Sequence, residues 1–297
     1  MNGHRTASEG RTGPRPWLQI FLAGLTLWAA TVVVTVWTQN TNLVPAVILL
    51  GSFLVPVTFV VWAYEKGRGR YVTVELLFTT FLVGGVLGVL GASILEAYLL
   101  KPSVLIYVGV GLIEEGVKLL ALAFVARKMR RRTTFDGLVL GAAVGFGFAA
   151  FESAGYAFNA LFSGEGSSLR QLVETEILRG VLAPVGHGLW TAITGGVLFA
   201  AGHDGRWRIT RGVVLTYLGV SLLHALWNSM YGIAVALTLV LTGRPWQFSA
   251  LRVGQIPDVT ETQVHLSTVL DWGGLVLISV IALLWARHLF RRASASG

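Results

Sequence analysis

The chain has 297 residues, of which 54% are hydrophobic and 13% charged, with no cysteine and a formal net charge of +8. So apolar a composition excludes a water-soluble globular domain and is typical of a polytopic membrane protein. The absence of cysteine excludes disulfide bonds and thiol catalysis. The positive charge lies in short segments between apolar runs, which favours a role in membrane orientation over nucleic-acid binding.

Eight apolar runs are long enough to cross a bilayer, which takes at least about 18 residues. They predict an all-α, polytopic bundle of about eight membrane-spanning helices. The expected spans are Trp17–Trp37, Leu43–Tyr64, Val72–Leu99, Ser103–Ala126, Phe135–Phe162, Ile177–Gly202, Gly212–Leu241 and Thr268–His288. The first 16 residues are polar, with no small-residue cleavage site at the expected distance, so we expect no removable signal peptide.

Lysine and arginine alternate between the segments that join these spans. Five alternate segments hold 17 of the 23 basic residues: the N-terminus, 66–70, 127–132, 206–211 and 287–292. The opposite segments hold five, namely Lys101, Arg170, Arg179, Arg244 and Arg252, and Lys118 lies inside a span. Cytoplasmic loops collect positive charge. We therefore expect cytoplasmic tails at 1–16 and 289–297, flanking one integral-membrane domain at 17–288.

Two carboxylates and an ammonium interrupt the apolar run from Ser103 to Ala126. A charge at the centre of a membrane helix costs about 2.5–3.5 kcal/mol on insertion scales, so such residues indicate function by default. Glu114 and Lys118 are i,i+4 and Glu115 and Lys118 are i,i+3, so the ammonium can pair with either carboxylate. Pairing with one would leave the other partly uncompensated. The alternative is a structural ion pair that holds two helices together.

Polar residues also recur at helical spacing in the next three spans. The fifth carries Gly137, Gly141, Gly145, Phe148 and Glu152 on one face; the sixth carries Pro184, His187, Thr191 and Gly195; the seventh carries Tyr217, Ser221, His224, Asn228 and Tyr231. Glycines at that spacing let a neighbouring backbone approach closely. The acidic and histidine residues fall at matching depth, between the midplane and the outer third. Four helices, within about 103–241, therefore predict one membrane-embedded catalytic core.

These residues resemble the motif set of the PrsW intramembrane proteases, which are related to the CAAX prenyl endopeptidases and the Abi proteins. The matching motifs are Glu114-Glu115-x-x-Lys118, Asp136-Gly137-x-x-x-Gly141, Gly145 to Glu152, His187-x-x-x-Thr191 and His224-x-x-Trp227-Asn228. The resemblance covers about Gly109 to Tyr231, and the first two spans and the eighth fall outside the motifs. It implies a metalloprotease, and for some members a first cut in an anti-sigma factor. Ser153 departs from the asparagine expected after Glu152.

Amide hydrolysis inside a bilayer needs a base that activates water and donors that stabilise an oxyanion. Glu114 or Glu115 is the candidate base, with Lys118 holding the other; Glu114, first in the motif, is the expected one. Glu152, His187 and His224 have the residue types of a zinc site, which three helices would have to assemble. In a metal-free scheme, a histidine acts as the acid or positions groups. His224 and Asn228 then stabilise the oxyanion.

Two other classes of function stay open at this point. A proton- or ion-coupled transporter would also place carboxylates and histidines at mid-membrane, although the interrupted helices expected in both halves of an inverted repeat are absent. A non-catalytic scaffold or immunity protein would keep the site for binding. As a protease, the chain would act on a membrane-embedded protein or peptide from within a bacterial-type cell membrane, without nucleic acid.

Overall fold

A computed structural model describes residues 15–66, 72–163, 168–202, 206–251 and 257–295. Over these ranges the chain is helical and forms no strand. The helices are α1 Pro16–Thr38, α2 Val44–Lys66, α3 Val74–Leu99, α4 Ile106–Val125, α5 Thr134–Leu161, α6 Leu169–Leu182, α7 His187–Ala201, α8 Arg211–Thr242, α9 Pro245–Leu251 and α10 Glu261–Ala295. Most of the predicted tail at 1–16 lies outside the described residues, as do Arg5, Arg11, Arg68, Arg70 and Arg252 of the charge count.

The predicted polytopic helix bundle is confirmed. Seven helical segments of the described chain are long and apolar enough to span a membrane, with α6 and α7 together forming one of them. The remaining predicted span, Ser103–Ala126, corresponds to α4, whose 20 residues hold Glu114, Glu115 and Lys118 near their middle. The last helix is longer than expected, because it begins at Glu261 and continues to Ala295.

The sixth predicted span is a broken helix. Its helical structure begins at Leu169, earlier than the expected Ile177, because the Ser168 side chain caps the first turn by accepting a hydrogen bond from the Gln171 N–H. Pro184 has no N–H to donate, and a 3-10 turn at Ala183–Val185 separates α6 from α7. The break places His187 at the first position of α7.

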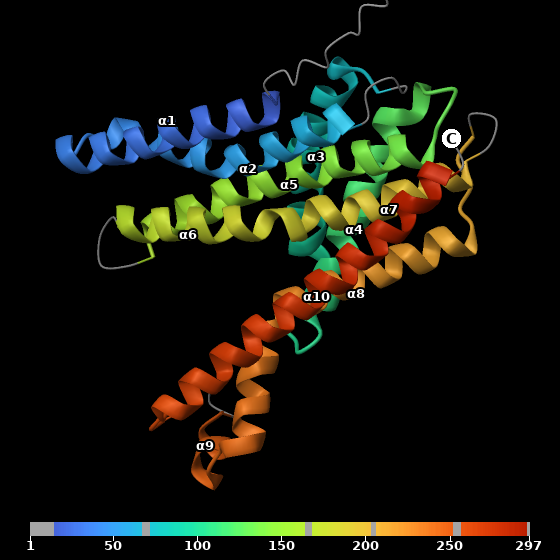
Figure 1. Cartoon of the computed structure of the whole chain (residues 1–297). Coiled ribbons are helices and arrows are strands. Elements are labelled where there is room, and N and C mark those ends of the chain that lie inside the picture. The colour runs from blue at the N-terminus through green and yellow to red at the C-terminus, as the bar shows by residue number, and fades with distance from the viewer. Residues whose placement is uncertain (1–14, 67–71, 164–167, 203–205, 252–256, 296–297) are drawn as a thin grey trace, which may run out of the picture.

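Helix α5 is the centre of the bundle, with every residue from Phe135 to Ala150 buried. It packs against α7 along one side and against α2 and α3 along others (Figure 1). A Cβ atom at Gly137, Gly141 or Gly145 would overlap backbone carbonyl groups of α7. The predicted close approach at these glycines is therefore confirmed, and it fixes α7 against the helix that carries Glu152.

Replacing Gly145 should separate α5 from α7. An added Cβ would collide with the His187 carbonyl oxygen, which belongs to a backbone that cannot move without its helix. Gly145→Ala should therefore reduce the free energy of unfolding by about 1–3 kcal/mol, the usual cost of overpacking. The melting temperature should fall accordingly. Gly155→Ala, in the same helix, is the matched control, because nothing lies within 4 Å of a Cβ there. Equal melting temperatures for the two variants would contradict this packing.

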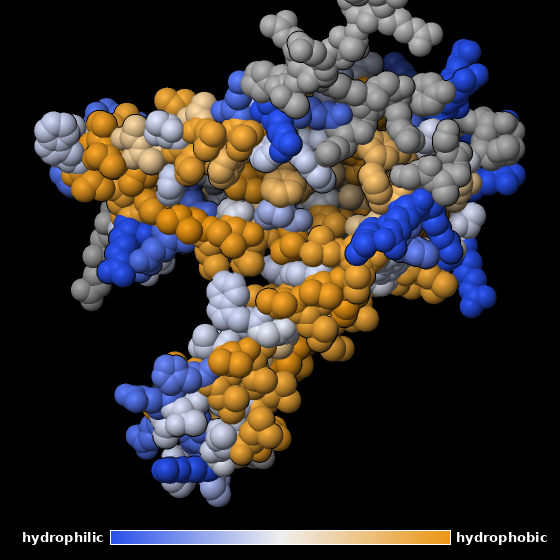
Figure 2. Space-filling model, in the orientation of Figure 1, coloured by the Kyte–Doolittle hydropathy of each residue, from blue (hydrophilic) through white to orange (hydrophobic). Residues whose placement is uncertain are grey.

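Many large apolar side chains are exposed, as a lipid-facing surface requires, and Figure 2 shows apolar surface along the helices on the face that it draws. Helices α8 and α10 pack against each other and, with α9 between them, extend away from the rest of the bundle (Figure 1). At 1.5 Å per residue, the 32 residues of α8 measure about 48 Å. Since that exceeds a hydrocarbon core of about 30 Å, α8 must tilt or protrude.

Candidate active site

Lys118 lies at the centre of the site and is completely buried. Its Nζ donates to Glu115 Oε1 at 2.8 Å and to Glu114 Oε2 at 3.0 Å. The same ammonium lies 3.9 Å from the centre of the Phe148 ring. The expectation that Lys118 pairs with only one of the two carboxylates is therefore wrong, because its ammonium forms an ion pair with both. Their remaining contacts distinguish the two acids.

The protein itself uses both oxygens of Glu115. Besides Lys118, this carboxylate lies 3.1 Å from His224 Nδ1 and accepts a long hydrogen bond of 3.5 Å from the Thr191 hydroxyl. Glu114 has fewer protein contacts: beyond Lys118, its Oε2 lies 3.8 Å from His224 Nε2 and 4.0 Å from His187 Nδ1. Both carboxylates thus lie close to the two imidazoles, since Glu115 Oε1 is also 3.9 Å from His187 Nδ1, and Glu114 is the one that makes fewer hydrogen bonds to the protein.

Hydrogen bonds at the ring nitrogens indicate the tautomer of each histidine. Lysine only donates, so Nδ1 of His187, 2.8 Å from Lys118 Nζ, is the acceptor, and its Nε2–H donates to Glu152 at 3.2 Å. His224 donates from Nδ1–H to Glu115, which leaves the lone pair of Nε2 on the side of Glu114. Each imidazole is thus oriented by one carboxylate.

Glu114, His187 and His224 form a group that can hold a metal ion. One donor atom from each lies within 4.8 Å of the others. Two imidazoles and a carboxylate suit zinc, and carboxylates on the outer ring nitrogens are the usual second layer of such sites. The residues therefore fit a metal, although Lys118 would have to leave His187 Nδ1 for that nitrogen to bind one. Glu152, a predicted ligand, lies outside this group.

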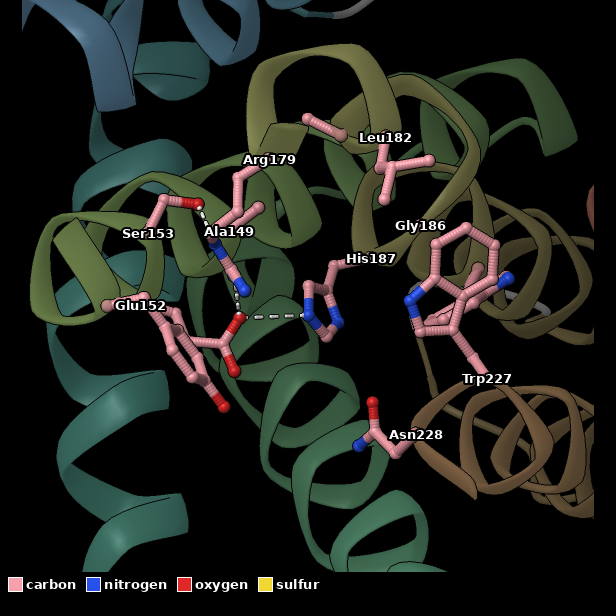
Figure 3. A pocket seen from close by; sticks show the side chains of 12 residues that line it. Ala149, Glu152, Ser153, Arg179, Leu182, Gly186, His187, Trp227 and Asn228 are labelled. Carbon is pink, nitrogen blue, oxygen red and sulfur yellow. Dashed lines mark hydrogen bonds and ion pairs between the residues drawn. The ribbon is translucent and has the colours of Figure 1, made fainter. Parts of the chain in front are cut away.

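Glu152 lines a cavity that lies beside the group formed by Glu114, His187 and His224. The cavity has a volume of about 90 Å³, enough for several water molecules, and is bordered by α5, α6, α7 and α8. Figure 3 shows the Glu152 carboxylate between His187 and Arg179, with the Asn228 amide on the other side of the imidazole. Asn228, the predicted oxyanion donor, therefore lines the same space as His187.

Arg179 is the site residue that sequence reasoning missed. Its Nη2 donates to Glu152 at 2.5 Å, its Nε donates to the Ser153 hydroxyl at 2.7 Å, and its guanidinium lies over the Tyr156 ring. Ser153, the departure from the expected asparagine, is thus the partner of this arginine. An arginine within the predicted span Ile177–Gly202 is a visible signal in the sequence, although the alternation of basic residues groups it with the outer loops.

Comparison with protein families gives a match to the model of the PrsW family intramembrane metalloproteases over residues 72–252. The chain therefore belongs to the PrsW family. It is an intramembrane protease and a multi-pass membrane protein. The match extends from α3 to α9, so α1, α2 and α10 lie outside it, as predicted for the first two spans and the eighth. Comparison with curated proteins and with solved structures finds no match.

Proposed function

We propose that this PrsW protein hydrolyses a peptide bond of a membrane-embedded substrate at the site formed by Glu114, His187 and His224. The supporting observation is that these three groups meet deep in the bundle, next to a cavity large enough for water and lined by Asn228. At 1.5 Å per residue, Glu114 lies about 12 Å from the first residue of α4. With both termini cytoplasmic, that end of α4 is the outer one, and the cut falls in the outer half of the membrane.

The surrounding residues have distinct roles in this proposal. Glu115 and Glu152 orient His224 and His187 through their outer ring nitrogens. Lys118 offsets the charge of the two neighbouring carboxylates, which could not otherwise stay ionised in so buried a place. Asn228 donates to the carbonyl oxygen of the substrate as negative charge develops on it.

Zinc, when bound by Glu114, His187 and His224, would supply a water molecule acidified for attack at neutral pH. In the metal-free alternative, Glu114 takes the proton from water directly. Both schemes require Glu114. They differ in whether the imidazoles bind a metal or position groups by hydrogen bonding.

Metal analysis of the pure protein distinguishes these schemes. We expect about one zinc ion per chain, lost in His224→Ala because a ligand is removed. Glu152→Gln should keep the ion with affinity weaker by about 10–100-fold, as for an outer-shell partner. Loss of zinc in Glu152→Gln to the same extent as in His224→Ala would restore Glu152 as a ligand. Full peptidase activity in metal-free protein, insensitive to chelators, would favour the glutamate–histidine scheme.

We also propose a bacterial-type cell membrane location with both termini cytoplasmic, on the strength of the alternating basic residues. A reporter inserted near Arg130 should be cytoplasmic, and one near Lys101 should be exterior. The opposite result would place the site in the inner half of the membrane. The substrate class follows from the site: a membrane-spanning protein, with an anti-sigma factor as the candidate suggested by the PrsW family.

A further inference from the structure

A second, larger cavity lies on the opposite side of α7 from the active site. This inner groove has a volume of about 610 Å³ and is walled by α2, α5, α7 and α10. Phe59, Trp62, Phe146 and Leu189 are among its wall residues. Among the described residues that line it, Arg287 is the only charged one. A groove that is otherwise apolar fits a hydrocarbon ligand, with room for one anionic group at the arginine.

The inner groove occupies one half of the membrane. Along α5 it extends from Phe135, next to the start of the helix, to Phe146, a distance of about 17 Å at 1.5 Å per residue. Half of a hydrocarbon core of about 30 Å is about 15 Å. With the orientation given by the basic residues, this half is the cytoplasmic one. A membrane-spanning peptide would continue past the groove, whereas a single acyl chain matches its length.

Basic residues continue from the groove toward the end of α10. Arg291 is one helical turn beyond Arg287, and both are exposed. Hydrophilic surface gathers at the C-terminal end of α10, next to apolar surface along the same helix (Figure 2). Basic sites between transmembrane helices on the cytoplasmic side are where anionic headgroups bind.

We propose that the inner groove binds an acyl chain of an anionic glycerophospholipid from the cytoplasmic leaflet, with the lipid phosphate on Arg287. Bound there, the lipid fills the space between α2 and α10 and supports α7, the helix that begins with His187. This role is separate from the hydrolytic reaction and does not depend on the assignment of the catalytic residues.

Lipid binding to the full chain in detergent tests the proposal. Phosphatidylglycerol and phosphatidylcholine with identical acyl chains are compared by native mass spectrometry. The wild type should bind phosphatidylglycerol about fivefold more tightly, the factor for about 1 kcal/mol per arginine at the membrane surface. Arg287→Gln should abolish that preference, whereas Arg130→Gln, which changes an exposed basic residue outside the groove lining, should retain it.

A groove-filling variant tests the acyl-chain part of the proposal. Ala63 lines the groove, so Ala63→Phe should weaken the binding of both lipids roughly tenfold, as expected for excluding about two methylene groups. Equal binding of the two lipids by the wild type, or identical behaviour of Arg287→Gln and Arg130→Gln, would overturn the proposal. So would unchanged lipid binding in Ala63→Phe together with slower cleavage of a membrane peptide, which would assign the groove to the substrate.

Discussion

Glu114→Gln should abolish most of the peptidase activity while the protein still folds. Glutamine keeps the shape of the side chain and can still accept a hydrogen bond from Lys118, but it neither takes a proton from water nor binds a metal as a carboxylate. The rate of cleavage of a single-pass membrane peptide should fall by about 10²–10⁴-fold, the typical contribution of a positioned base. The melting temperature should change less than in Glu115→Gln, because Glu115 has more protein contacts.

Two controls make this result specific. Glu75→Gln changes an exposed acid in the first turn of α3 and should leave both rate and melting temperature near those of the wild type. Glu115→Gln removes the charge that faces both Lys118 and His224, so it should lower the melting temperature. Near-normal cleavage by Glu114→Gln would mean that this residue is neither base nor ligand. Near-normal cleavage by both variants would exclude a base in this motif.

Lys118→Met should cause the largest loss of stability of any single substitution considered. The change leaves two buried carboxylates, three residues and four residues away on α4, without their counter-charge. Removing one partner of a buried ion pair costs about 3–5 kcal/mol. The melting temperature and the yield of folded protein should both drop. Lys101→Met, which changes an exposed lysine next to the end of α3, should leave both the melting temperature and the yield near those of the wild type.

A double variant separates charge from packing at Lys118. Glu115→Gln together with Lys118→Met removes one of the two uncompensated carboxylates, so it should recover part of the melting temperature lost in Lys118→Met. No recovery would indicate that the lysine acts through its packing against Phe148. Greater stability of Lys118→Met than of the wild type would contradict the ion-paired arrangement altogether.

Much of the fold was predictable because a bilayer imposes length and polarity on each span. Helix α5 illustrates this: its glycine spacing predicted a close helix contact, and the structure places that contact against α7. The break at Pro184 was only partly predictable, since proline favours an interruption but does not say how the two halves continue. The bounds of α8 were predicted to within one residue, whereas the length of α10 was underestimated because a tilted helix has more residues than the minimum for crossing.

The sequence predicts which residues belong to the candidate site better than it predicts how they contact one another. Charged and histidine side chains are conspicuous in apolar helices, so Glu114, Lys118, His187 and His224 could be selected from spacing alone. Spacing could not show that Lys118 contacts both glutamates, because that depends on side-chain rotamers. It also could not show that Arg179 reaches Glu152, since these residues are on different helices and meet only through the packing of α6 against α5.

Mass spectrometry of the cleavage products shows whether the site formed by Glu114, His187 and His224 cuts a membrane-embedded peptide. The purified full chain is reconstituted in liposomes with a single-pass peptide whose fragments identify the cut bond. We expect cleavage within the outer half of the membrane-spanning segment by the wild type, and none above background by Glu114→Gln. An intact peptide with the wild type, accompanied by solute flux across the same liposomes, would contradict peptide cleavage at this site and identify a transporter.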